Sequence, residues 1–102
     1  MAGKVDARLA ELGVTLPDAP APAANYVPYV ISGNLVFISG QVSRAGGEEY
    51  TGKVGQDISQ EEGEKAARTC ALALLAQLKS ACGGDLDRVV RCVKLGGFVN
   101  CN

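Results

Sequence analysis

The chain has 102 residues and a mass of 10.5 kDa, which leaves room for one small domain. Hydrophobic residues make up 47% of it and charged residues 21%, proportions that exclude a disordered tail. Ten basic residues stand against eleven acidic ones and the pI is about 5.3, so binding to nucleic acid through phosphate neutralisation is disfavoured.

No segment has the pattern of a membrane span or a targeting signal. The longest uncharged stretch, residues 19–43, is interrupted by prolines and glycines, which prevent a spanning helix. The first residues include an acid at Asp6 and lack an apolar stretch, so they do not form a signal peptide. We therefore expect a cytoplasmic protein that has no membrane partner.

The first 24 residues are expected to precede the core. Residues 3–12 have helical spacing and are followed by Gly13, a residue typical of helix ends. One side of this helix is apolar, through Val5, Leu9 and Leu12. Residues 14–24 are rich in proline and alanine, which favours an extended surface connector. We expect a single domain over residues 1–102, with residues 25–102 as its partial core.

A β-hairpin is expected next. Two runs of β-forming residues, 26–32 and 35–38, flank the pair Gly33-Asn34, a typical two-residue turn. The second strand continues past Gly40, and a glycine within a strand indicates a bulge or a close approach of another group. Three features are then expected in order: a turn at Gly46-Gly47, a short third strand at Tyr50-Thr51 and a loop over residues 52–55.

The clearest element is a long helix between Ser59 and Gly83-Gly84. Ser59 and Glu62 have the spacing of a capping box, and the glycine pair is typical of a helix end. The side chains expected to pack on a sheet recur at helical spacing and are Ala67, Cys70, Ala71, Leu74, Leu75, Leu78, Ala81 and Cys82.

The last segment is expected to be a strand. Residues 88–95 are rich in valine and are followed by Gly96-Gly97-Phe98-Val99, and the crossover through the long helix returns this strand to the sheet of the hairpin. The order of elements therefore predicts an α+β fold in which the helix covers one face of a sheet.

Isolated motifs carry little chemistry. Histidine is absent, which removes the commonest general base and metal ligand. No phosphate loop, nucleophile elbow or metal-binding motif is present, so neither a cofactor nor a metal is expected. The loop at residues 52–55 is interpreted as a turn, and the acids at residues 61–64 as solvated caps of the helix start.

The four cysteines are Cys70, Cys82, Cys92 and Cys101. On one helix, Cys70 and Cys82 would lie about 18 Å apart, and in one strand Cys92 and Cys101 would lie about 30 Å apart. Both distances exceed the roughly 7 Å that a disulfide can span, while bridges between helix and strand remain open. We interpret the cysteines as buried, reduced thiols; a reactive nucleophile is the alternative, and it would lack a histidine partner.

Several segments together resemble the Rid/YjgF family, which is also labelled endoribonuclease L-PSP. The resemblance covers about residues 20–100. It is carried by Asn25-Tyr26-Val27-Pro28-Tyr29, the hairpin with Ser39-Gly40-Gln41-Val42, Gly55-Gln56-Asp57-Ile58-Ser59, the alanine-rich helix with Leu74-Leu75, and Asp85-Leu86-Asp87-Arg88-Val89-Val90.

The resemblance implies a chorismate-mutase-like α+β fold, incomplete at its C-terminus, that assembles as a homotrimer with clefts between subunits. It also implies hydrolysis of reactive enamines and imines, such as 2-aminoacrylate, to 2-oxo acids and ammonia. Tyr26 matches the family tyrosine that lies over the ligand, and Ser39 and Gly40 match the pair that lines the cleft. Val27-Pro28 replaces a polar pair found in many members, which makes the cleft mouth less polar.

The catalytic residues stay unknown, because the family arginine and glutamate fall beyond Asn102; Arg88 and Arg91 lie in the wrong element to replace the arginine. We therefore expect the 102-residue chain to be an inactive piece of a Rid-type hydrolase. The alternative is a non-catalytic trimeric module that binds small molecules or acts as a chaperone. The ribonuclease label agrees poorly with the pI of about 5.3.

Overall fold

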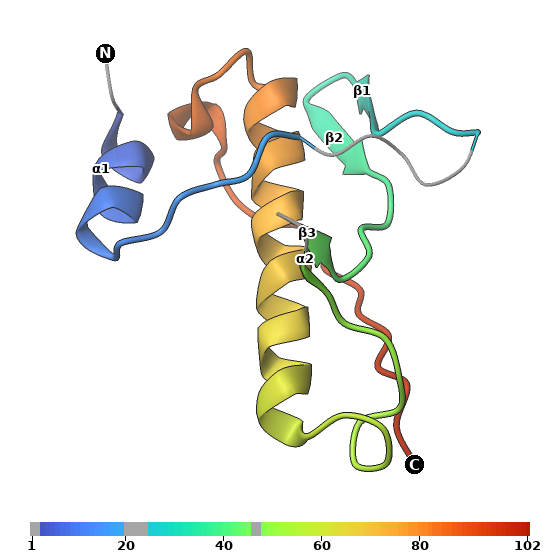
Figure 1. The fold of residues 1–102 in the computed structure, drawn as a ribbon. Helices are drawn as coiled ribbons and strands as arrows, with labels where there is room; N and C mark the ends of the chain where they lie inside the picture. Colours follow the sequence, from blue (N-terminus) through green and yellow to red (C-terminus); the bar gives the residue numbers. More distant parts are fainter. Residues whose placement is uncertain (1–2, 20–24, 46–47) are drawn as a thin grey trace.

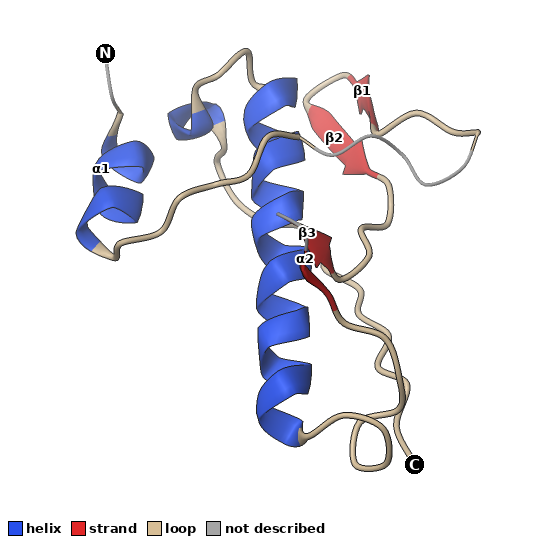
Figure 2. Ribbon diagram, in the orientation of Figure 1, coloured by secondary structure: helices blue, strands red, loops and turns tan. Residues whose placement is uncertain are grey.

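The computed structural model describes residues 3–19, 25–45 and 48–102. Along the chain the elements are α1 (Lys4–Glu11), β1 (Tyr29–Ser32), β2 (Leu35–Ile38), β3 (Arg44–Ala45), β4 (Glu48–Glu49), α2 (Gln60–Ala81) and the 3₁₀ turn η1 (Leu86–Arg88). Helix α2 forms the long axis, the strands lie on one side of it and α1 lies on the other (Figure 1, Figure 2). The predicted α+β class is confirmed.

Helix α2 begins with the predicted capping box. The Ser59 side chain accepts a hydrogen bond from the Glu62 backbone N–H at 3.1 Å, and Glu62 accepts one from the Ser59 N–H at 3.2 Å. At the other end, Gly83 has a φ of +66° and the Gly84 N–H donates to the Lys79 carbonyl. Two backbone groups at the start and one carbonyl at the end are thus satisfied locally.

The predicted hairpin is also confirmed, but its strands are shorter than predicted: β1 begins at Tyr29, and β2 ends at Ile38, so Gly40 does not lie within a strand. Strands β1 and β2 pair antiparallel, with Tyr29 opposite Ile38 and Ser32 opposite Leu35. Gly33 has a φ of +59°, in the left-handed region that the tight turn requires and that glycine enters without steric cost. Both strands contact α2, and the Tyr29 hydroxyl lies 3.3 Å from the Ser80 hydroxyl of α2.

The innermost face of α2 differs from the predicted one. Its buried residues are Ala73, Ala76 and Gln77, and Ala73 is only 1% exposed. The predicted face was centred on leucines, but Leu74, Leu75 and Leu78 are only half-buried and Ala71 is exposed. The reason is steric, since the hairpin lies close to α2 and small side chains admit that approach, whereas leucines extend beside it.

The core beyond α2 is small. Among the described residues, the buried apolar ones are Ala73, Ala76, Cys82 and Leu86. Cys82 closes the end of α2 and Leu86 begins η1, so the buried set lies where helix, hairpin and 3₁₀ turn meet.

The predicted C-terminal strand is wrong as an element. Residues 89–100 follow an extended course, but none of them belongs to a β-ladder, and residues 90–100 are all exposed. The segment is attached only at its ends, by η1 and by a parallel bridge between Val54 and Cys101. High β-propensity does not make a strand without a partner edge, because the ladder hydrogen bonds need a second chain segment.

The third strand is also displaced. Tyr50-Thr51 lies outside any strand, and the chain instead forms the short antiparallel pair β3–β4, with Arg44 opposite Glu49. This pair is a separate sheet from β1–β2, so the single returning sheet is not formed. The predicted turn at Gly46-Gly47 lies outside the described residues. The loop at residues 52–55 is confirmed and contributes only Val54, in isolated bridges.

The N-terminal helix is confirmed as Lys4–Glu11. Gly13 follows it with a φ of +68°, and the Val14 N–H donates to the Leu9 carbonyl, which is the pattern of a glycine-terminated helix. The second half of the predicted connector, residues 20–24, lies outside the described residues. Within the described part of the chain, no helix has the length and apolar character to cross a membrane.

The corrected packing face of α2 gives a test with a matched control. Ala73→Leu should destabilise the fold by about 1–3 kcal/mol, because the site is full and the added carbons force the hairpin outward. Ala71→Leu makes the same change at an exposed position of the same helix and should stay within about 0.5 kcal/mol. Urea denaturation of both variants measures the difference. Equal loss in both would show that Ala73 does not face the hairpin.

Candidate functional site

The three predicted site residues lie at one end of the hairpin. Ser39 follows β2 directly, and its hydroxyl donates to the Val27 carbonyl at 2.5 Å while its N–H donates to the Pro28 carbonyl at 2.9 Å. These bonds tie the end of β2 to the segment before β1. Tyr26 immediately precedes Val27, so the structure brings Tyr26, Ser39 and Gly40 together; their role in binding stays a prediction.

The space around Gly40, next to the Ser39 hydrogen bonds, is open. It is exposed, and a Cβ built on it would meet no atom within 4 Å. Its backbone is also outside the positive-φ region that demands glycine. A close approach by another part of the chain, one of the two predicted reasons for a glycine here, is therefore not present. The backbone at Gly40 stays accessible to a ligand or to another chain.

Gln41 belongs to the motif that carries the family resemblance, but no role in the site was predicted for it from the sequence. Its side-chain amide donates to the Ser39 carbonyl at 3.1 Å, which closes a tight loop around Gly40 and fixes the direction of the Gly40 backbone. The signal for this role is the adjacency of a long amide side chain to the Ser-Gly pair, since such a side chain can bond the backbone two residues away.

The surroundings of the site are apolar. Tyr26 is 42% exposed, Val27 58% and Val42 56%. On the hairpin itself, Val30 and Phe37 are directly opposite each other and are both more than half exposed. Exposed apolar side chains that gather on a small domain are typical of a binding region for a ligand or for another chain.

Residues that come directly after the site in the sequence line a hollow. It has a volume of about 270 Å³ and is lined by Val42, Ser43, Arg44, Glu49, Tyr50 and Thr51. The Ser43 hydroxyl donates to the Tyr50 carbonyl at 2.7 Å, and Arg44 pairs with Glu49 at 3.0 Å. The hollow therefore presents hydroxyl and backbone groups together with the exposed Arg44–Glu49 ion pair, which is weak in water.

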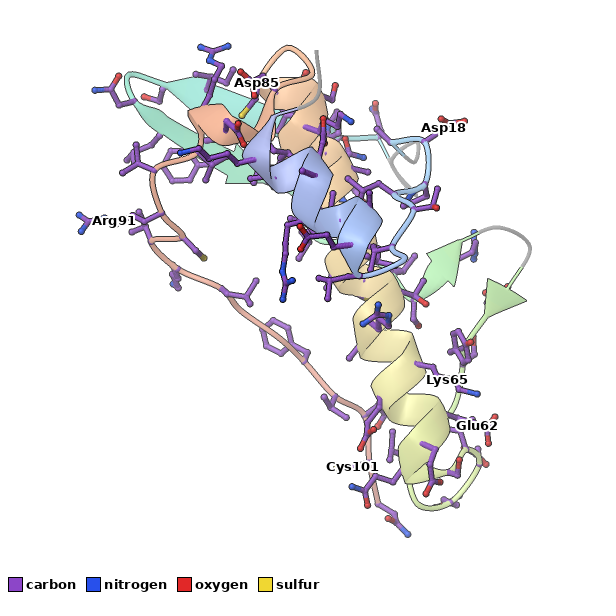
Figure 3. The ribbon with its side chains drawn as sticks, turned by 90° about the vertical axis from the view of Figure 1, so that its left-hand side faces the viewer. Asp18, Glu62, Lys65, Asp85, Arg91 and Cys101 are labelled. Carbon is purple, nitrogen blue, oxygen red and sulfur yellow. The ribbon has the colours of Figure 1, made fainter. Side chains whose placement is uncertain are left out.

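Two other arginines were considered from the sequence, Arg88 and Arg91. Arg88 donates to the Cys82 carbonyl at 3.2 Å, so it helps to close the end of α2. Arg91 points outward from the extended C-terminal segment (Figure 3). That neither arginine matches a carboxylate-binding arginine stays a prediction.

The cysteines are free, in agreement with the reduced state predicted, but only Cys82 is buried; Cys92 and Cys101 are exposed. Exposure of the last two follows from the unpaired C-terminal segment that carries them. Burial raises the pKa of the Cys70 thiol, which lowers its thiolate fraction and its nucleophilicity. Among the described residues, no group of histidine, cysteine or carboxylate side chains could hold a metal ion.

The family model described as "YjgF/chorismate_mutase-like, putative endoribonuclease" matches residues 6–102. The chain belongs to this family. The match includes the site turn, α2 and the extended C-terminal segment, so the family assignment rests on nearly the whole chain and not on the hairpin motif alone.

Two solved structures and one curated protein are similar to this YjgF-family chain. Protein TCP17 of Trypanosoma cruzi is 50% identical over 99 residues, which cover 96% of this chain and 61% of TCP17. The crystal structure of a putative endoribonuclease from Shewanella oneidensis is 39% identical, with a TM-score of 0.77, over 84% of this chain and 57% of that one.

Atu1372 of Agrobacterium tumefaciens, a protein of unknown function, is 48% identical with a TM-score of 0.66, over 78% of this chain and 48% of that one. This chain therefore spans about half to three-fifths of the length of these relatives.

The hydrogen bond from the Ser39 hydroxyl to the Val27 carbonyl can be tested separately from any activity. Ser39→Ala removes the bond to the Val27 carbonyl and should lower the free energy of unfolding by about 1 kcal/mol. Ser39→Thr keeps the hydroxyl and should lose less than half of that. Chemical denaturation of both variants measures the effect. If alanine and threonine are equivalent, the hydroxyl does not hold the segment before β1.

Proposed function

We propose that this YjgF-family chain forms part of an enamine/imine deaminase. The substrate class is a small 2-imino or 2-enamino acid such as 2-aminoacrylate, and the products are a 2-oxo acid and ammonia. Such a hydrolysis needs the substrate carboxylate held by a cation, the C=N bond polarised and a water placed for attack. We place the reaction in the cytoplasm.

One observation carries the proposal: the turn around Gly40 is open to solvent beside an exposed tyrosine. Nothing lies within 4 Å of the position of a Gly40 Cβ, and Tyr26 stands next to the residue that binds Ser39. A small planar molecule could lie beneath the Tyr26 ring and against the Gly40 backbone. The apolar mouth at Val27 would exclude water from one side of it.

The described residues supply positioning without the full catalytic set. Arg44 pairs with Glu49 at the surface and Arg88 bonds the Cys82 carbonyl, and the proposal assigns neither of them as the substrate anchor. In the resemblance to the Rid family, the arginine and glutamate for these tasks fall beyond Asn102. The proposal therefore assigns binding to Tyr26, Ser39 and Gly40, and expects the 102-residue chain alone to lack activity.

The same proposal includes a homotrimer. Val30, Leu35 and Phe37 leave the outer surface of the hairpin exposed, and burying such a surface against copies of the chain would stabilise both. The Gly40 turn lies at the end of this hairpin, so a neighbouring subunit placed there would form the second wall of the cleft.

A second function is favoured by the apolar mouth. Val27 is 58% exposed where many relatives of the Rid type carry polar residues, and a less polar cleft suits a module that binds a small molecule without converting it. Ribonuclease activity, named in the family description, requires a basic surface for the phosphates, whereas this chain has a net charge of −1.

The activity test uses the chain alone and the chain extended at its C-terminus by the final segment of TCP17. With 2-aminoacrylate generated in situ, the extended protein should release 2-oxo acid at least tenfold faster than buffer, and the chain alone should not. Gly40→Val in the extended protein should abolish this rate, because the added side chain fills the open position beside Tyr26.

Gly96→Val is the matched control, since Gly96 is equally open and also outside the positive-φ region; it should keep the rate. A folded extended protein with no rate above buffer would overturn the deaminase proposal. Saturable binding of the imine's stable analogue without turnover would support the non-catalytic module. Cleavage of RNA by the same preparation would support the family label instead.

A further inference from the structure

Helix α1 is attached to the rest of the molecule by very few contacts. It has eight residues, and none of them is buried. A helix of this length is unstable alone in water, because the cost of nucleation exceeds what its few hydrogen bonds return. Its stability must therefore come from the contacts that hold it against the body of the protein.

The main contact is one carboxylate from the other end of the chain. Asp87 in η1 accepts the Lys4 N–H at 2.7 Å and the Val5 N–H at 2.9 Å. These are two of the N–H groups that the first turn of a helix leaves without partners. Asp87 thus does from 82 and 83 residues away what an N-cap side chain normally does locally.

The residue at the local cap position makes room for this arrangement. Gly3 is the N-cap of α1 and has no side chain to accept a hydrogen bond. A Cβ on Gly3 would come far inside van der Waals distance of the Asp87 carboxylate. Because Gly3 has no side chain, the Asp87 carboxylate can occupy the space beside the helix start. Any side chain at position 3 would have to displace this carboxylate.

A second contact lies along the helix. Lys79 of α2 and Asp6 of α1 are 3.4 Å apart, with side chains 40% and 27% exposed. Figure 3 shows α1 lying across η1 and the adjoining part of α2, and α1 and η1 are in contact. These two polar contacts join side chains of the body to α1.

We propose that α1 is a detachable element with a docked and a detached state, in which Asp87 caps the helix from η1 and so couples its folding to its docking. Docked, α1 covers η1, whose Leu86 is 3% exposed. Detached, α1 loses its cap and unfolds, and the surface of η1 opens next to the extended C-terminal segment.

Acid should favour the detached state. The backbone bonds from Val5 and Lys4 hold the pKa of the Asp87 carboxyl below its ordinary value of 3.8. A lowered pKa in the docked state means that docking is fully favourable above pH 3.8 and is lost as the pH falls below it. The charged groups around this contact are Lys4 and Asp6 on α1, Asp85 and Arg88 in η1, and Lys79 on α2.

Hydrogen exchange of the α1 amides at pH 7 and trypsin cleavage after Arg8 test the proposal on the 102-residue chain. Asp87→Ala should speed both at least tenfold while α2 stays protected. Asp85→Asn is the matched control: it removes the same charge two residues away, its side chain can still accept the Asp87 N–H, and no bond joins Asp85 to α1. It should leave both rates within twofold.

Gly3→Ser separates capping from docking and leaves the sequence of η1 unchanged. Serine can cap the helix locally, but its Cβ displaces Asp87, so trypsin cleavage after Arg8 should accelerate and the Asp6–Lys79 pair should separate. Rates for Asp87→Ala and Gly3→Ser that both match wild type would overturn the proposal. So would uniform exchange over α1 and α2 in Asp87→Ala, which would show that α1 opens only with the whole fold.

Discussion

The contact between the small side chains of α2 and the β1–β2 hairpin is the interaction on which the rest of the structure depends. Ala73 and Ala76 are buried there, and their size lets the strands come close enough for Tyr29 to reach Ser80. That closeness sets the position of β2, and through the Ser39 bonds it sets the turn at Gly40. The candidate site is therefore held by helix packing more than by its own contacts.

The same contact explains what remains exposed. Small residues bury little apolar area, and roughly 25 cal/mol is gained per Å² removed from water. The outer surface of the hairpin, with Val30 and Phe37, and the C-terminal segment, with Phe98, receive no cover from this core. Burying this exposed apolar surface between copies of the chain would stabilise the proposed trimer. The small core also offers little apolar surface to α1, which is docked through the Asp87 carboxylate.

The sequence predicted features that depend on neighbouring residues. The capping box at Ser59, the turn at Gly33 and the end of α1 at Gly13 each follow from local backbone chemistry. The missing strand at residues 89–100 could not be foreseen, because pairing depends on a partner edge. Asp87 is 83 residues from Lys4 and has no local signal. For the site, the sequence located Tyr26, Ser39 and Gly40 by resemblance, while the Gln41 bond required coordinates.

Sedimentation velocity tests the central claim, that copies of the chain cover the hairpin surface that α2 leaves exposed. The account predicts a species of about three times the mass of the 10.5-kDa chain. It also predicts that Phe37→Glu gives monomers, whereas Phe98→Glu, at a more exposed position on the C-terminal segment, leaves the assembly intact. A folded wild-type monomer at micromolar concentration, or equal dissociation by both variants, would contradict the account.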